Sequence, residues 1–250
     1  MMSIPIIIIC FNNYKYVQNM IEQINRIQPN YKTDIIIMNN SSDDPSTLKY
    51  LKKIRLYYRV IDRDNNGPWI SPDRNTDLYN ELPDKFILTD PDLELNAKLP
   101  TYFIEQMVTL SDKHQIGKLG FAISIEDRDK MYPGNYMLGC SIHDWEYQYW
   151  ANRINDRNYE LYDAPIDTTF ALINKKYWCN WSVRMAGNFT CKHLPFYIEN
   201  PIMTIEEEYK YYSKSKHSTI YKVFKPYFDE KYIVIDDDES PDKYRIEKRA

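Results

Sequence analysis

Two carboxylates one residue apart, Asp90 and Asp92, are the clearest candidates for chemistry in this chain. Carboxylates placed this closely repel each other unless a positive partner lies beside them. Their hard oxygen atoms suit Mg²⁺ or Mn²⁺, and such an ion in turn attracts a phosphate-bearing ligand. The alternative interpretation of the same residues is a solvated turn, and their position in the fold decides between the two.

The pair follows a short apolar run, Phe86-Ile87-Leu88, which is typical of a buried strand. Pro91 lies between the two carboxylates, and because proline cannot donate to a sheet ladder, the strand should end before it. In an open α/β sheet the carboxyl ends of the strands form the edge where ligands bind. The position of the pair therefore favours a cation site over a turn.

The chain before this pair alternates between apolar runs and helical patterns. The runs that predict strands are residues 3–10, 34–38 and 58–61. Such alternation predicts the α/β class with a Rossmann-like, doubly wound and mostly parallel sheet, followed here by a smaller C-terminal region. The runs are followed by the polar clusters Phe11-Asn12-Asn13, Asn39 to Asp44 and Asp62 to Gly67. These clusters should meet Asp90 at one edge of the sheet.

Composition and absent motifs exclude several classes of protein. The formal net charge of −4, with acidic and basic residues interspersed, argues against binding to nucleic acid. No Gly-rich phosphate loop follows the first strand, which disfavours P-loop ATPases and NAD enzymes. The sequence shows no secretory or membrane segment. We expect a cytoplasmic protein without a membrane span, whose cysteines are reduced and lack zinc-site spacing: Cys10, Cys140, Cys179 and Cys191.

Three further features complete a recognisable order of motifs. They are Asn66-Gly67, the run DTTFAL from Asp167 to Leu172, and His193 with Pro195 close behind. Together with the clusters after the first two strands and Asp90-Pro91-Asp92, this order resembles that of inverting glycosyltransferases with the GT-A fold, in the broad family-2 group. The resemblance covers about residues 4–197.

The resemblance also implies a division of the chain. A GT-A domain would occupy residues 1–205, with a nucleotide-sugar-binding half at 1–98 and an acceptor-side half at 99–205. Residues 206–250 would be a C-terminal helical extension and a charged tail. The segment from Asp236 onward is so rich in charge that we expect it to be solvated.

The resemblance implies a donor site at the ends of the first strands. Residues that would line the nucleoside pocket or approach the ribose and phosphates are Phe11, Asn12, Asn40, Asn66, Gly67 and Asp90. One departure from the family pattern concerns the second strand. Such enzymes usually carry an aspartate there that reads the base, and this chain has Asn39 or Asn40 in its place.

The metal and the base would come from residues farther along the chain. Asp90, Asp92 and His193 would hold Mn²⁺ or Mg²⁺, and Asp167 would be the general base that takes the acceptor proton. Asp163 is the alternative base. Arg184 and Lys192 would either neutralise the diphosphate or, as we expect, remain solvated surface charges.

The implied function is metal-dependent transfer of a sugar, of the hexosyltransferase type, from a nucleotide-diphosphate donor such as a UDP-sugar. The acceptor would be a glycan or a glycoprotein. One alternative is a nucleotidyltransferase that makes sugar nucleotides, but such an enzyme should carry a Gly-rich basic loop after the first strand. The other is a non-catalytic glycan-binding protein on a degenerate transferase fold, which the retained Asp90, Asp92 and Asp167 disfavour.

Overall fold

The computed structural model describes residues 4–28, 35–178, 180–215, 218–237 and 240–249. The chain forms two compact units, of which the first comprises Met1–Ser124 and Tyr149–His193 and the second Ile125–Gln148 and Leu194–Ala250. All of the candidate site residues belong to the first unit. Residues 3 and 34, where two of the predicted strands begin, and Cys179 lie outside the described residues.

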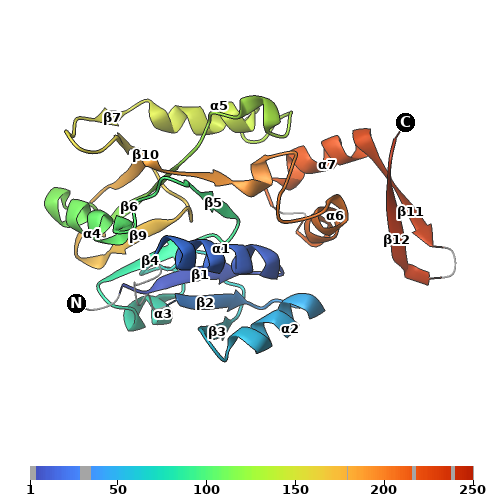
Figure 1. Ribbon diagram of the computed structural model, residues 1–250, viewed down its shortest axis with the longest axis horizontal. Coiled ribbons are helices and arrows are strands. Elements are labelled where there is room, and N and C mark those ends of the chain that lie inside the picture. The colour runs from blue at the N-terminus through green and yellow to red at the C-terminus, as the bar shows by residue number, and fades with distance from the viewer. Residues whose placement is uncertain (1–3, 29–34, 179, 216–217, 238–239, 250) are drawn as a thin grey trace. The chain divides into compact units, whose positions relative to one another are not determined.

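One half of the main sheet is parallel and has the strand order β3-β2-β1-β4. The strands are β1 (Ile6–Cys10), β2 (Ile35–Asn40), β3 (Arg59–Arg63) and β4 (Lys85–Thr89). Figure 1 shows β1 and β2 beside helices α1 and α2. Every residue of β1 and β2 is buried, as expected for isoleucine-rich parallel strands that are covered on both faces. Their register brings the carboxyl ends of β1, β2 and β4 to one edge.

One helix of this unit, α2 (Pro45–Ile54), begins at a local start signal in the sequence. At α2, the Asp44 side chain accepts a hydrogen bond from the Thr47 amide at 2.9 Å, and Pro45 fills the first helical position. Asp44 is thus the N-cap of α2. The elements are α1 (Tyr14–Ile27), α2 (Pro45–Ile54), α3 (Thr76–Glu81), α4 (Phe103–His114) and the single turns η2 (Gln148–Trp150) and η3 (Lys175–Tyr177).

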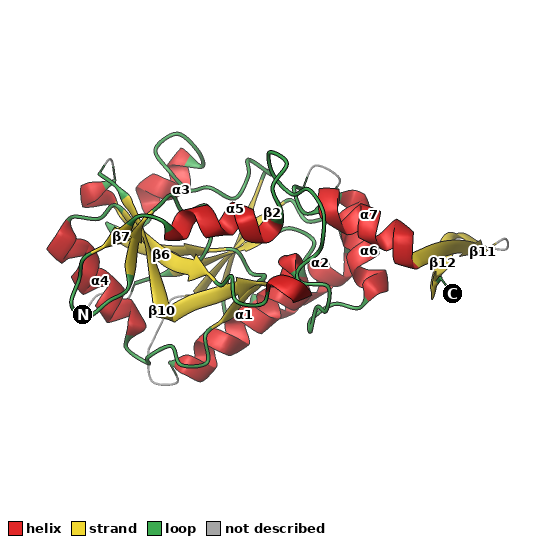
Figure 2. Ribbon diagram, turned by 90° about the horizontal axis from the view of Figure 1, so that it is seen from above, coloured by secondary structure: helices red, strands yellow, loops and turns green. Residues whose placement is uncertain are grey.

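The other half of the sheet contains antiparallel strands. They are β5 (Leu93–Leu95), β6 (Lys118–Ile123), β7 (Arg153–Ile154), β8 (Leu161–Asp163), β9 (Ala171–Asn174) and β10 (Ser182–His193). β9 lies between β4 and β6 and runs antiparallel to both. β10 pairs parallel with β6, and Figure 2 shows these two strands side by side. The predicted α/β class is confirmed, with this antiparallel insertion into the parallel sheet.

Strand β10 changes partners along its length. Its register against β6 shifts between Met185 and Thr190, and Gly187 in this irregular segment has a φ of +63°. Beyond the bulge, the end of β10 also pairs antiparallel with β5, so that His193 lies opposite Leu93. A bulge bends and twists a strand, and here β10 pairs with β8 before the bulge and with β5 after it.

The core of this unit lies on the two faces of the sheet. On the face that α3 covers, apolar residues of β1, β2 and β4 pack with Leu78 and Tyr79. Elsewhere the rings of Phe103, Phe121 and Phe170 form a cluster in which Phe121 stacks on Phe170 with centroids 4.9 Å apart. These contacts fix β9 and the chain that leads into it.

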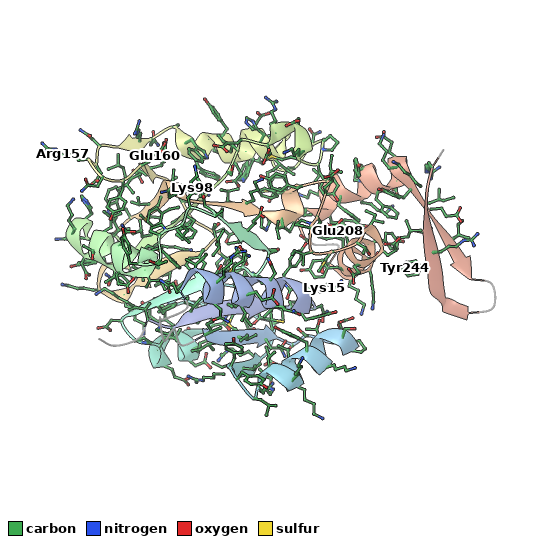
Figure 3. All side chains as sticks on the ribbon, in the orientation of Figure 1. Lys15, Lys98, Arg157, Glu160, Glu208 and Tyr244 are labelled. Atoms are coloured by element: carbon green, nitrogen blue, oxygen red, sulfur yellow. The ribbon has the colours of Figure 1, made fainter. Side chains whose placement is uncertain are left out.

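The second unit is mainly helical. Its elements are η1 (Arg128–Lys130), α5 (Ile142–Tyr147), η4 (Leu194–Phe196), α6 (Ile205–Lys214), α7 (Tyr221–Lys231), β11 (Tyr232–Asp237) and β12 (Ser240–Lys248). A capping box of Thr204 and Glu207 starts α6. Figure 3 labels the Glu208 side chain of α6. Glu208 is buried and accepts hydrogen bonds from Asn200 and Tyr132, and burial raises its pKa to about 7.

The predicted solvated tail contains a strand, because β11 and β12 pair as an antiparallel hairpin, and the side chains from Tyr244 to Lys248 are mostly exposed. The continuous apolar run from Tyr232 to Ile235 is a strand signal that lies just before the charged segment. Among the helices of the described residues, none is both long and apolar enough to cross a membrane.

Candidate functional site

Asp90 lies directly after β4 and is held by the segment that leads into β9. Its amide donates to the Thr168 carbonyl oxygen at 2.8 Å, and the Thr168 hydroxyl donates to its carboxylate. Burial and the charge of Asp92 raise the pKa of the Asp90 carboxyl. Two carboxylates in this environment favour a bound cation, because the cation offsets both their repulsion and their loss of solvent.

His193 lies beside the Asp90 and Asp92 carboxylates although it comes one hundred positions after Leu93 in the sequence. Because it pairs opposite Leu93 in the β10–β5 ladder, it lies next to Asp92, with its Nε2 atom 3.4 Å from Asp92 Oδ1. Asp92 Oδ1 is buried, and it accepts no hydrogen bond from the described part of the chain. An orphaned buried carboxylate oxygen beside an imidazole fits a divalent cation.

The donor set therefore fits Mn²⁺ or Mg²⁺ in its chemistry. In the described ranges, no three His, Cys, Asp or Glu side chains converge closely enough to form a ready-made metal cluster. Protein carboxylates often share such an ion with substrate phosphates instead of enclosing it.

The polar residues after β1 and β2 interlock through Asn12. Its side-chain oxygen accepts from the amides of Asp43 and Asp44 at 2.8 and 2.9 Å, and its Nδ2 donates to Asp43 Oδ1 at 2.7 Å. Its own amide donates to Ser42 Oγ at 3.0 Å. Asn12 has a φ of +54°, which asparagine tolerates better than most residues. The two loops are thus fixed to each other.

Asn40 and Gly67 are also brought together. Asn40 Nδ2 donates to the Gly67 carbonyl at 3.2 Å, and Asn40 Oδ1 is buried with no hydrogen-bond donor among the residues that the structure describes. Only 3% of Asn40 is exposed. Phe11 is half-buried after β1, and Asn66 is exposed beside Gly67. Asn40 therefore presents a buried acceptor at the strand edge.

The neighbouring asparagine has a different environment. Asn39 Nδ2 donates to Asp62 Oδ1 at 2.9 Å, and Asn39 Oδ1 accepts from the Ser42 amide at 3.2 Å. The hydrogen bond from Asn39 holds the pKa of the Asp62 carboxyl below its usual range, and Arg55 lowers this pKa further. An aspartate at position 39 would face another carboxylate, which gives a physical reason for the asparagine.

Asp167 lies in the loop between β8 and β9, where its side chain is exposed. Its Oδ1 atom accepts a hydrogen bond from Trp69 Nε1 at 2.8 Å. Lys118 Nζ donates to the carbonyl oxygens of Ile166, at 2.9 Å, and of Asp167. Asp163, the alternative base, is the last residue of β8 and is also exposed.

Two of these partners, Trp69 and Lys118, were not predicted as site residues. Trp69 follows a Gly-Pro turn close to a predicted strand end. The sequence thus places Trp69 near the edge of the sheet but does not indicate a role for it. Lys118 begins a strand, and no local pattern distinguishes it from a solvated lysine. The expected solvated position of Arg184 was wrong: it is 4% exposed, its Nε donates to the Pro165 carbonyl at 2.9 Å, and its guanidinium lies 4.0 Å from the centroid of the Tyr149 ring.

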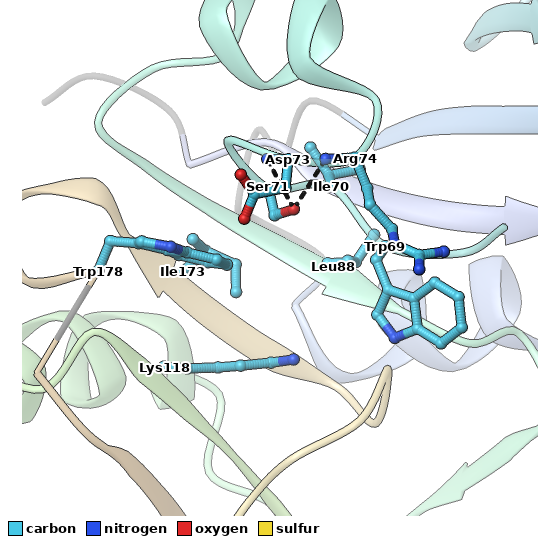
Figure 4. Close-up of a pocket in the computed structure, with 9 residues that line it drawn as sticks. All are labelled: Trp69, Ile70, Ser71, Asp73, Arg74, Leu88, Lys118, Ile173 and Trp178. Atoms are coloured by element: carbon cyan, nitrogen blue, oxygen red, sulfur yellow. Dashed lines mark hydrogen bonds between the residues drawn. The ribbon is translucent and has the colours of Figure 1, made fainter. Parts of the chain in front are cut away.

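A pocket of about 350 Å³ opens beside these residues. Its wall is formed by Trp69, Ile70, Ser71, Asp73, Arg74, Leu88, Lys118, Ile173 and Trp178. Figure 4 shows the Lys118 side chain extended toward the Trp69 indole, with Trp178 on the opposite side. Arg74 lies over the Trp69 ring, 5.0 Å from its centroid. The base candidate thus has an apolar cavity with cationic side chains as its neighbour.

Comparison with known proteins gives a family match. The model of the family described as "Glycosyl transferase family 2" matches residues 6–177 of this chain. No curated protein matches the chain.

Solved structures with a similar fold share little sequence with this chain. One is S. aureus TarS 1-349 in complex with UDP-GlcNAc, at 16% identity and a TM-score of 0.37, covering 54% of this chain and 38% of that one. Another is the mannosyltransferase PcManGT from Pyrobaculum calidifontis in complex with GDP-Man and Mn²⁺, at 9% identity and a TM-score of 0.46, covering 89% and 68%. The chain spans less than half the length of the TarS structures that it matches.

Proposed function

This chain belongs to glycosyl transferase family 2 and has the GT-A fold, and we propose that it is a metal-dependent, inverting glycosyltransferase. The donor is a nucleotide-diphosphate sugar, a UDP-sugar by preference, and the enzyme is of the hexosyltransferase type. The acceptor is a hydroxyl group of a glycan or a glycoprotein. The observation that carries the proposal is the 2.8 Å hydrogen bond between the Asp90 amide and the Thr168 carbonyl, which joins the carboxylate pair to the Asp167 loop.

On the donor side, Phe11, Asn12 and Asn40 line the nucleoside pocket, and Asn66 and Gly67 lie along the ribose and phosphates. The buried Asn40 Oδ1 supports a base that offers a hydrogen-bond donor, such as the N–H group of uracil, because that oxygen has no donor of its own among the described residues. A divalent cation, Mn²⁺ or Mg²⁺, would be held by Asp90, Asp92 and His193, and it would supply positive charge where negative charge grows on the departing diphosphate.

On the acceptor side, Asp167 takes the proton of the acceptor hydroxyl. The acceptor oxygen forms its bond to the anomeric carbon as the bond from that carbon to the diphosphate breaks, so the configuration inverts. A general base of this kind typically contributes about 10²–10⁴-fold in rate. Because the displacement is direct, the reaction needs no second, nucleophilic carboxylate.

We also propose a cytoplasmic location and no nucleic-acid partner. The support is the interspersed charge of the chain and the free thiols of Cys10, Cys140 and Cys191.

Thermal unfolding with UDP and Mn²⁺ tests the donor site. Binding to the folded state alone raises stability by about 2.7 kcal/mol at one hundred times Kd. We expect UDP to stabilise the protein in a Mn²⁺-dependent way and Asp92→Ala to abolish that stabilisation. Glu94→Ala is the matched control, because Glu94 is an exposed carboxylate on β5 only two residues away. The same stabilisation in wild type and Asp92→Ala would contradict the donor site.

Turnover then separates the enzyme from the two alternatives. With a panel of UDP-sugars, release of UDP that Asp92→Ala abolishes and Glu94→Ala preserves would support a transferase. A glycan-binding protein would release no UDP with any donor. A nucleotidyltransferase would instead form pyrophosphate from UTP and a sugar phosphate.

A further inference from the structure

The loop that carries Asp167 is bound along its backbone. Each carbonyl oxygen of residues 165–168 accepts a hydrogen bond from another element. The donors, in order along the loop, are Arg184 Nε at 2.9 Å, Lys118 Nζ at 2.9 Å, Lys118 Nζ again, and the Asp90 amide at 2.8 Å. Ile166 and Thr168 are buried, and a buried carbonyl oxygen needs a hydrogen-bond donor, so these contacts hold the backbone of the loop to the neighbouring elements.

Lys118 contributes two of these hydrogen bonds from the start of β6. Burial lowers the pKa of Lys118, and the neighbouring carboxylates of Asp167 and Asp90 oppose that shift. A half-buried ammonium group is costly unless it is hydrogen-bonded and near negative charge. The loop carbonyls and the Asp167 carboxylate meet both needs, so the cation and the loop fix each other.

The Asp167 side chain is oriented by Trp69, which lies 98 positions earlier in the chain. The indole Nε1 donates to Oδ1 at 2.8 Å, which leaves the second carboxylate oxygen for another partner. Trp69 is itself fixed, because its carbonyl accepts from Asn75 Nδ2 at 2.7 Å and Arg74 covers its ring. The indole N–H group that binds Asp167 is thus held in a fixed position.

We infer that Trp69 and Lys118 are positioning residues for the Asp167 base, an inference that rests on the proposed function. Trp69 selects the orientation of the carboxylate, and Lys118 sets the position of the backbone that carries it. Reaction rates depend steeply on such placement, since a displacement of about 1 Å can cost about 10²-fold. Neither residue needs to contact the acceptor for this role.

Trp69→Phe tests the orienting hydrogen bond. The substitution removes the indole N–H and keeps an aromatic ring under Arg74. We expect kcat to fall about tenfold or more while KM for the donor and the Mn²⁺-dependent stabilisation by UDP remain unchanged. Trp178→Phe is the matched control, because Trp178 lines the other side of the same pocket and packs on Tyr79; its kcat should stay at the wild-type value.

Lys118→Met and Lys118→Arg test the backbone contact. Methionine retains the length of the side chain without its donors, whereas arginine restores a cation with several donors. We expect kcat to fall for Lys118→Met, with KM for the donor unchanged, and to recover in part for Lys118→Arg. Where Lys118→Met fails to fold, the comparison of Trp69→Phe with Trp178→Phe decides.

Asp167→Asn separates this inference from the proposed function. If Asp167→Asn turns over like the wild type, the base assignment fails and the positioning roles fail with it. If Asp167→Asn is inactive while Trp69→Phe and Lys118→Met keep the wild-type kcat, only the positioning roles are overturned. A loss of kcat in Trp69→Phe, with donor KM unchanged and Trp178→Phe active, supports the inference.

Discussion

The two halves of the main sheet deliver side chains to the same edge by different routes. In the parallel half, the candidate residues follow their strands: Asn12 comes after β1, and Asp90 comes after β4. In the antiparallel part, Asp167 precedes β9 instead. Because β9 runs antiparallel to β4, with Ala171 opposite Leu88, the beginning of one strand meets the end of the other.

This difference shows that position relative to a strand has no meaning without the direction of that strand. A residue before a parallel strand would lie at the opposite edge, far from Asp90. Reversal of β9 turns the residues before it into neighbours of the carboxylate pair, as the contacts of Thr168 with Asp90 show. The parallel part, together with His193, should therefore govern nucleotide affinity, and the loop before β9 should govern turnover.

The largest effect that tests this division is expected from Asp167→Asn. We expect kcat to fall about 10²–10⁴-fold, because the amide cannot take the acceptor proton. Stabilisation by UDP and Mn²⁺ should equal that of the wild type. Asp163→Asn is the control, since Asp163 is exposed at the end of β8, and it should keep its activity. If Asp163→Asn loses activity and Asp167→Asn keeps it, Asp163 is the base.

A smaller effect is expected from Gly120→Ala in β6, where β9 approaches closely. A Cβ atom at Gly120 would lie 2.9 Å from Ala171 Cβ and 3.1 Å from both Ile166 Cδ1 and the Phe170 carbonyl oxygen. Overpacking of this kind typically costs about 1–3 kcal/mol. We expect chemical unfolding to show such a loss and turnover to fall with it, while UDP affinity is retained.

A second substitution, Ala171→Gly, tests whether the contact with Ala171 causes the loss of stability in Gly120→Ala. Ala171→Gly removes the nearest of the three contacts, so the pair Gly120→Ala with Ala171→Gly should recover part of the lost free energy. If Gly120→Ala weakens UDP binding as much as it weakens turnover, the two parts of the sheet are not separable.

The parallel half could be predicted from the sequence because its signals are local. A buried apolar run followed by Asp90-Pro91-Asp92 predicts both a strand and the residue at which it ends. The register of β1, β2 and β4 agrees with that prediction. The hydrogen bonds between Asn12 and Asp43 could not be predicted from the sequence, because they depend on a backbone φ of +54° at Asn12. The roles of these residues remain predictions.

The approach of His193 could not be derived from local patterns. It depends on a bulge in β10 and on a ladder to β5, between residues that lie one hundred positions apart. The burial of Arg184 depends equally on non-local packing against Tyr149. In the tail, charge suggested a solvated segment, while pairing between β11 and β12 satisfies the backbone of the described residues.

The smallest effect concerns the parallel half and the substitution Asn39→Asp, which would install the aspartate common in the family. Aspartate at position 39 would still accept from the Ser42 amide, but it would face Asp62 in place of donating to it. Asp62 is largely exposed but position 39 is buried, so solvent screens only part of the repulsion, and we expect a loss of about 1–2 kcal/mol in the free energy of unfolding at pH 7. Turnover should change little if Asn40 reads the base.

The pH dependence of this variant follows from the sign of the interaction. Repulsion between two carboxylates raises a folded-state pKa above its unfolded value, so the loss should be present at pH 7 and shrink as the pH falls toward about 4. Adding Asp62→Asn restores a donor opposite the new carboxylate, and urea unfolding of the double variant should recover most of the stability. A double variant as unstable at pH 7 as Asn39→Asp alone would show that the contact with Asp62 is not the reason for the asparagine.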